Sequence, residues 1–151
     1  MRTVSEIMTP TVQAIHRDES IQEAERIFVT QNISGAPIRD GIGNLVGFIS
    51  KTDIIRFDSS GEDPTYTRLH EIASPKVVTI DASVPINEAA QKMLQEHIHH
   101  LVVMEGESMV GVLSALDFVR IVAEFVANDE EEDITENKGT GLFSRLLKLF
   151  N

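Results

Sequence analysis

The sequence reads Gly-Phe-Ile-Ser-Lys-Thr-Asp at residues 47–53 and Gly-Val-Leu-Ser-Ala-Leu-Asp at residues 111–117. In both stretches a short apolar run ends at a serine, and an aspartate follows three positions later. Serine is a favoured N-cap residue, and an acidic side chain in the first turn suits the positive end of the helix dipole. These stretches therefore predict the same junction twice, a strand that passes directly into a helix.

The match between the two stretches extends outward along most of the chain. Pro75 lies 65 positions after Pro10, whereas Asp117 lies 64 positions after Asp53, so one residue is lost between these points in the second copy. The loss falls at a glycine-containing turn, where a change of length is well tolerated. The chain is therefore an internal repeat.

Each copy predicts the same order of elements. Apolar residues at helical spacing predict helices that begin at Ile21 and Ile86, the first with Ser20 as N-cap and Glu23 completing a capping box. A Thr-Pro or Ser-Pro turn precedes the first extended run of each copy. Strands are expected at 12–15, 36–38 and 45–49 and again at 77–80, 101–104 and 109–113, and the second helices begin at Ser50 and Ser114.

A unit of about 60 residues is too small to bury both faces of its sheet, but two such units can share one core. We therefore predict an α+β fold of two βαββα repeats related by pseudo-two-fold symmetry, with the sheets packed together and the helices outside. The first repeat would span residues 1–60 and the second residues 61–126. Residues 127–151 would form an acidic linker and a short amphipathic helix.

The repeated unit resembles the CBS domain, the unit named after cystathionine beta-synthase. The resemblance is carried by residues 4–10 (Val-Ser-Glu-Ile-Met-Thr-Pro) and by the two Gly-x-x-Ser-x-x-Asp stretches, and it covers about 120 residues. It implies a tandem pair, or Bateman module, of the stand-alone bacterial or archaeal type, which commonly dimerises. Many such pairs bind AMP, ADP or ATP in clefts between the repeats, others bind different adenosyl ligands, and some bind nothing known.

The chemistry of the repeated junction fits a nucleotide. The glycine lets a ligand approach the strand closely, the helix N-terminus suits phosphate, and a carboxylate accepts two hydrogen bonds from the adjacent hydroxyls of a ribose. By resemblance, Asp53 and Asp117 contact the ribose, and Ser50 and Ser114 lie near the ribose or phosphate. The alternative is a purely structural cap, in which the serine side chain hydrogen-bonds the backbone and the aspartate carboxylate interacts favourably with the positive end of the helix dipole.

The resemblance also assigns an adenine slot and a phosphate contact. The slot would be lined by apolar residues that also suit the core, namely Val12, Ala36, Pro37, Ile38, Val77, Leu101 and Val102. His99 and His100 match positions that face a phosphate in the family. Because the first copy has Ser34-Gly35 there, the two clefts are not equivalent. A metal site at His97, His99 and His100 is the less favoured alternative, because the chain contains no cysteine and a zinc site would need further ligands.

Composition and the motifs that the sequence lacks argue against several other classes of protein. The formal net charge of −11 argues against general nucleic-acid binding, because phosphate backbones favour clustered Lys and Arg. No apolar run approaches the roughly 18 residues that span a bilayer, and residues 1–6 lack the apolar core of a signal peptide, so we expect a cytoplasmic protein. No nucleophile-elbow or Walker-type motif is present, which predicts that the protein is not an enzyme.

The C-terminal segment has a pattern of its own. Residues 128–133 form an acidic block, a solvated linker or a helix end. Residues 142–150 place apolar side chains on one helical face and two basic side chains on the other, which favours docking on a protein partner over a membrane surface. The same segment could instead pack on the protein's own dimer or stay disordered.

The sequence therefore predicts a regulatory module and energy sensor that binds AMP, ADP or ATP. Without an effector domain, it would act through a partner or through self-association as a homodimer. The alternative is a ligand-free interaction scaffold that uses the amphipathic segment at residues 142–150.

Overall fold

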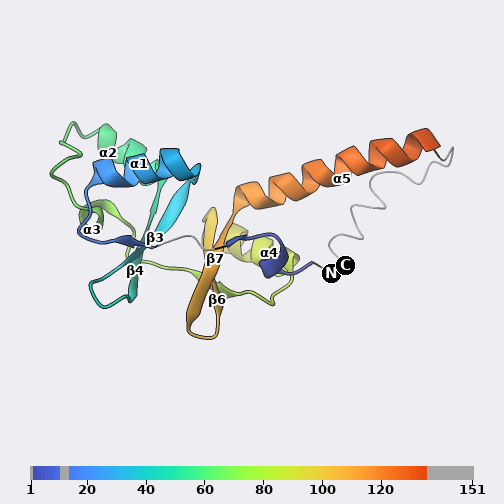
Figure 1. The fold of residues 1–151 in the computed structure, drawn as a ribbon, viewed down its shortest axis with the longest axis horizontal. Helices are drawn as coiled ribbons and strands as arrows, with labels where there is room; N and C mark the ends of the chain where they lie inside the picture. Colours follow the sequence, from blue (N-terminus) through green and yellow to red (C-terminus); the bar gives the residue numbers. More distant parts are fainter. Residues whose placement is uncertain (1, 11–13, 136–151) are drawn as a thin grey trace. The chain divides into compact units, whose positions relative to one another are not determined.

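The computed structural model describes the backbone of residues 2–10 and 14–135 and side chains as far as residue 127 (Figure 1). The chain divides into two compact units. Unit 1 comprises Met1–Pro10 and Thr79–Asn151, and unit 2 comprises Thr11–Val78. Each unit combines its own small sheet with helices, which confirms the predicted α+β class and the repeat.

Unit 2 is built on a three-stranded sheet with the order β2-β3-β4. Its elements are β2 (Ile15–His16), α1 (Ile21–Gln31), β3 (Gly35–Arg39), β4 (Leu45–Ser50), α2 (Lys51–Asp58) and α3 (Leu69–Ile72). Strand β3 pairs parallel with β2 and antiparallel with β4. The core combines residues from the sheet and all three helices, namely Ile15, Ile21, Ala24, Phe28, Ala36, Ile38, Ile49, Ile54, Phe57 and Leu69.

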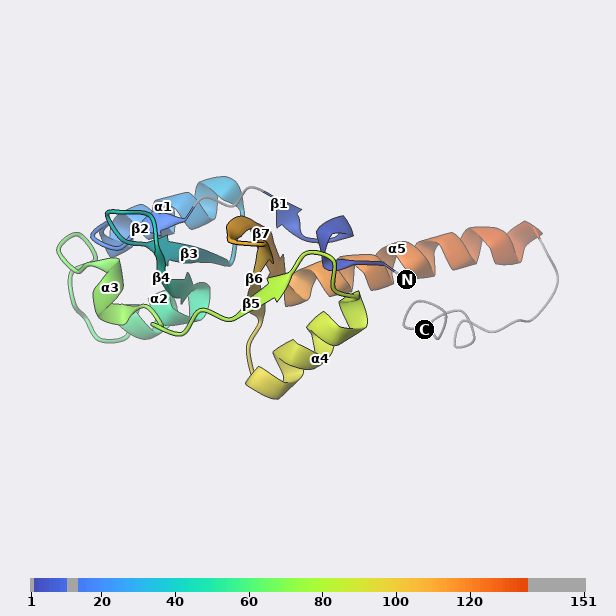
Figure 2. The same cartoon turned by 90° about the horizontal axis from the view of Figure 1, so that it is seen from below.

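Unit 1 is built on a four-stranded sheet with the order β1-β7-β6-β5, and Figure 2 shows β1 at one edge and α4 beside the other. Its elements are the 3-10 helix η1 (Val4–Glu6), β1 (Thr9–Pro10), β5 (Thr79–Asp81), α4 (Ile86–Glu96), β6 (His100–Glu105), β7 (Ser108–Ser114) and α5 (Ala115–Thr135). Strand β6 pairs parallel with β5 and antiparallel with β7, as in unit 2.

The repeat extends to small structural details. The ladder between the paired strands shifts register after Ile38 in unit 2 and after Val103 in unit 1, which are equivalent positions. Helices α1 and α4 both end on a left-handed residue, Asn32 and His97, with φ angles of 52° and 53°. His97 therefore serves as the end cap of a helix.

The first segment of each repeat packs on the sheet of the other repeat. Strand β1 of the first repeat pairs antiparallel with β7, placing Thr9 opposite Val112 and Pro10 opposite Gly111. In return, Ser74 of the second repeat exchanges two backbone hydrogen bonds with Phe48 of β4, at 2.9 and 3.0 Å. Each compact unit therefore contains most of one repeat and the opening segment of the other.

The same exchange involves the first residues of α4 and α1, each of which bonds the chain just before the opening segment of the other repeat. The Ile86 N–H donates to the Arg2 carbonyl at 3.1 Å, and the equivalent Ile21 N–H donates to the Thr67 carbonyl at 3.1 Å. Val4 and its equivalent Leu69 are both fully buried. These two segments are therefore part of the core of the unit on which they pack.

Hydrogen bonds from Thr3 to an acidic side chain hold the N-terminal segment in shape. The Thr3 N–H donates to the Glu6 carboxylate at 2.6 Å, and this backbone hydrogen bond, with a second from the Thr3 hydroxyl, lowers the pKa of Glu6. In unit 2 the Arg68 N–H donates to the Glu71 carboxylate in the same way, at 2.7 Å.

Several local expectations were wrong. The Thr-Pro segment is a strand rather than a turn, and the run predicted at 77–80 becomes a strand only from Thr79. The Ser20 hydroxyl does accept the Glu23 N–H, but the Glu23 carboxylate pairs with Arg26. Leu94 of α4, although apolar, is 75% exposed.

The acidic block at residues 128–133 lies in α5, which continues to Thr135. Of its two interpretations, the structure therefore favours a helix end over a linker. The predicted amphipathic segment at residues 142–150 lies outside the described residues.

Candidate functional site

The Ser-x-x-Asp junction of unit 2 forms a reciprocal cap. Ser50 ends β4 in an extended conformation and is the N-cap of α2. Its N–H and its hydroxyl both donate to Oδ2 of Asp53, at 2.8 and 2.6 Å, and the Asp53 N–H points back at the hydroxyl at 3.4 Å. The second carboxylate oxygen, Oδ1, lies 3.6 Å from the Arg56 guanidinium.

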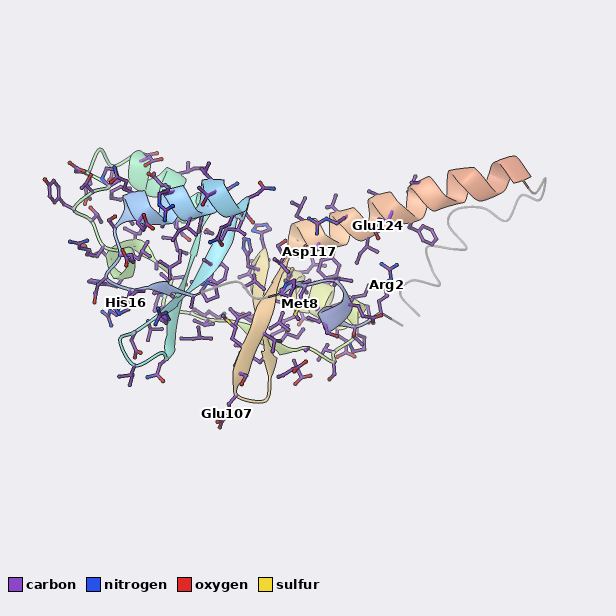
Figure 3. All side chains as sticks on the ribbon, in the orientation of Figure 1. Arg2, Met8, His16, Glu107, Asp117 and Glu124 are labelled. Atoms are coloured by element: carbon purple, nitrogen blue, oxygen red, sulfur yellow. The ribbon has the colours of Figure 1, made fainter. Side chains whose placement is uncertain are left out.

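The equivalent junction of unit 1 repeats the two serine donors and has a closer contact at the second carboxylate oxygen, Oδ1. The N–H and hydroxyl of Ser114 donate to Oδ2 of Asp117 at 2.7 and 2.8 Å. Oδ1 accepts a hydrogen bond from Arg120 at 3.2 Å. Figure 3 labels Asp117 at the start of α5. The structural cap weighed against a ligand contact is thus present in full in unit 2, where the Asp53 N–H also donates to the serine hydroxyl.

The two aspartates differ in exposure. The Asp117 side chain is 3% exposed and the Asp53 side chain 19% exposed, whereas both arginines are largely in solvent. Arg56 and Arg120 were not among the predicted site residues. Their spacing, three positions after each aspartate on a helix, is the sequence signal that could have found them.

Other predicted site residues are brought next to the junctions by the sheet. His100 pairs with Ser114 across the β6–β7 ladder, and the His99 carbonyl accepts the Ala115 N–H at 2.9 Å. In unit 2 the Ser34 carbonyl accepts the Lys51 N–H at the same distance. The chain preceding the middle strand is therefore fixed beside the start of the second helix in both units.

The predicted adenine-slot residues are mainly core residues. Ala36, Pro37 and Ile38 lie in β3, Leu101 and Val102 lie in β6, and all five are buried. Val77 is half-buried and belongs to no strand, and Val12 lies outside the described residues. Their contact with an adenine stays a prediction.

The motif glycines are each closely approached by another part of the chain. A Cβ at Gly47 would lie 2.8 Å from the Ser74 carbonyl oxygen, and one at Gly111 would lie 2.6 Å from the Thr9 carbonyl oxygen. A close approach at each glycine is thus made by the exchanged segment of the chain.

Three further features of the described residues concern a metal, a cavity and a membrane. No three His, Cys, Asp or Glu side chains there gather in a way that could hold a metal ion. A small cavity of about 150 Å³ in unit 2, near His16 and Arg39, shares no residue with the predicted site. No helix in the described ranges has both the length and the apolar character needed to cross a membrane.

The comparisons with known proteins agree with the repeat. The model of the CBS domain family matches residues 4–60 and again residues 69–124. Among curated proteins, the chain is 31% identical over 123 residues to a homoserine O-acetyltransferase of Methanohalobium evestigatum, covering 81% of this chain and 24% of that protein. It is 27% identical to the CBS domain-containing protein YhcV of Bacillus subtilis, covering 78% of this chain and 83% of that protein.

Among solved structures, the chain is similar to the CBS domain pair of protein MJ0100, described in complex with 5'-methylthioadenosine and S-adenosyl-L-methionine. The TM-score is 0.74 at 27% identity, and the alignment covers 82% of this chain and 98% of that one.

Proposed function

Since this chain belongs to the CBS domain family, we propose that it is a regulatory module that binds an adenosine-containing ligand, AMP, ADP or ATP, at its two Ser-x-x-Asp junctions. The observation that carries the proposal is the duplicated junction, in which a carboxylate is held at the start of a helix by the same two serine donors in both units. The MJ0100 domain pair, similar at 27% identity, supports an adenosyl ligand.

The chemistry of the junction suits a ribose followed by a phosphate. Each serine holds one carboxylate oxygen, so the other oxygen is oriented by the chain before a ligand arrives. That preorganisation lowers the entropy lost when two ribose hydroxyls bind the carboxylate. The N-terminus of α2 or α5 carries partial positive charge, which favours a phosphate close by. The module acts by binding, with no catalytic step.

The first prediction tests this assignment. Replacing Asp53 or Asp117 with asparagine should weaken nucleotide binding at that junction about tenfold or more, because hydrogen bonds to a charged acceptor are worth about 1.5–3 kcal/mol. Calorimetric titration with AMP, ADP and ATP measures it. Asp58→Asn, at the far end of α2, is the matched control and should bind as the parent does. Absence of heat with all three nucleotides in the parent would rule out the proposal.

We further propose that the module associates with itself. Each unit exposes apolar side chains at equivalent positions on its helices: Val29 on α1 matches Leu94 on α4, and Ile55 on α2 matches Val119 on α5. All four are at least 60% exposed. Leu116 and Val122 extend the exposed set along α5. Repeated apolar positions on helix surfaces are typical of a protein interface.

The second prediction concerns this surface. Replacing Ile55 and Val119 together with glutamate should convert a homodimer into a monomer, because a charged side chain would lose its hydration in the interface. Sedimentation velocity measures the mass. The matched control is Tyr66→Glu, at an exposed residue in the loop before α3, which should leave the mass unchanged. A parent that sediments as a monomer would contradict the proposal.

A further inference from the structure

Oδ1 of Asp117, the carboxylate oxygen that Ser114 does not contact, already accepts a hydrogen bond from the protein itself. A carboxylate offers about four lone-pair sites on two oxygens. Ser114 uses two of them on Oδ2, and Arg120 uses one on Oδ1 at 3.2 Å. One site is left on this carboxylate, whereas the two adjacent hydroxyls of a ribose need two.

The corresponding oxygen of Asp53, Oδ1, differs in its contact with the nearby arginine. Ser50 uses two lone-pair sites on Oδ2 in the same way. Arg56 lies 3.6 Å from Oδ1, which is an ion-pair distance and too long for a hydrogen bond. Within the described part of the chain, both lone-pair sites of this oxygen therefore remain available to a ligand.

We propose that Arg120 controls access to Asp117, and so makes the ribose site of unit 1 weaker than that of unit 2. The inference rests on the proposed function and deepens it. The Arg120 side chain is 61% exposed, so its guanidinium can leave the carboxylate for water. Ribose binding at Asp117 requires this displacement, and binding at Asp53 does not. Unit 2 therefore fills first as ligand is added.

The choice of probe separates access from charge. Removing an arginine also removes a positive charge, which weakens the attraction for any phosphate. Adenosine has the ribose and no phosphate, so it reports only on access to the carboxylate. Arg56 is the matched control, because it occupies the equivalent position and carries the same charge but makes no hydrogen bond to Asp53.

The third prediction isolates each junction with the asparagine variants. In an Asp53→Asn background, Arg120→Ala should tighten adenosine binding about fivefold, the equivalent of one exposed ion pair. In an Asp117→Asn background, Arg56→Ala should change it by less than about twofold on the same scale. Arg120→Lys should return the weak parental affinity, because lysine can still pair with an acid three residues earlier. Calorimetric or NMR titration measures each constant.

Salt provides a readout that a merely structural role would not move. Raising the ionic strength from about 0.01 M to about 1 M shortens the screening length from about 30 Å to about 3 Å. Because adenosine is neutral, its affinity for the Asp117 junction should rise with salt in the presence of Arg120 and stay flat in Arg120→Ala.

The outcomes separate this inference from the proposed function. If adenosine binds and both aspartate variants weaken it, but Arg120→Ala has no more effect than Arg56→Ala, the role of Arg120 is refuted and the nucleotide site stands. If adenosine, AMP, ADP and ATP bind neither junction of the parent, the proposed function fails and the role of Arg120 fails with it.

Discussion

Replacing Val4 with aspartate is expected to unfold the sheet of unit 1, although Val4 belongs by sequence to the repeat that forms most of unit 2. The side chain is fully buried beside the segment that pairs with β7. An unpaired charge at such a position should lower the free energy of unfolding by at least about 3 kcal/mol. That is a large part of the roughly 5–15 kcal/mol that stabilises a whole domain.

Hydrogen exchange can assign the loss to one unit. The amides of β6 and β7 should lose protection first, and those of β3 and β4 should keep it longer. Ser5→Asp, at the exposed neighbouring residue, is the control and should change stability by less than about 0.5 kcal/mol. Leu69→Asp should produce the mirror result, with β3 and β4 exposed first. Loss of protection in β3 and β4 upon Val4→Asp would contradict the exchange of segments.

Replacing Gly111 with alanine is expected to destabilise the protein by about 1–3 kcal/mol, the usual cost of forcing an extra methyl group into filled space. The new Cβ would lie 2.6 Å from the Thr9 carbonyl oxygen and 2.8 Å from the Met8 sulfur. The sulfur can move aside, but the carbonyl belongs to a backbone paired with β7. Thermal or chemical denaturation measures the change.

Gly41→Ala is the matched control for this experiment. Its Cβ would find its nearest neighbour at 3.9 Å, so the substitution should be neutral or stabilise by up to about 1 kcal/mol. If Gly111→Ala proved as harmless as Gly41→Ala but weakened nucleotide binding, the glycine would serve ligand approach, as its sequence first indicates, rather than the pairing with β1.

The local junctions could be read from the sequence because they depend on near neighbours. A serine that ends an apolar run can reach the N–H groups of the next turn, and an acid three positions later can reach back to it. Ser50 with Asp53, and Ser114 with Asp117, form these contacts in the structure. The repeat strengthened the prediction of these junctions, because two weak local signals at equivalent positions support the same local structure.

The candidate site could be predicted only in part. Its aspartates and serines were named from their spacing, but the hydrogen bond that distinguishes Asp117 from Asp53 depends on side-chain geometry. Both arginines have the same spacing from their aspartates, so no sequence pattern separates a contact at 3.2 Å from one at 3.6 Å. The apolar residues assigned to adenine could not be separated from core residues, since both need burial.

By itself, the sequence determined the repeat, the α+β class and the strand-to-helix junctions, because each follows from periodicity or from contacts within one turn of helix. Only the tertiary structure decided which sheet each opening segment joins. A strand of two residues such as Thr9–Pro10 has no periodicity to read, and its partner lies about one hundred residues away along the chain. That pairing in turn decided why Gly111 carries no side chain, and the approach of Ser74 decided the same for Gly47, since in both cases the space is filled by backbone from another segment.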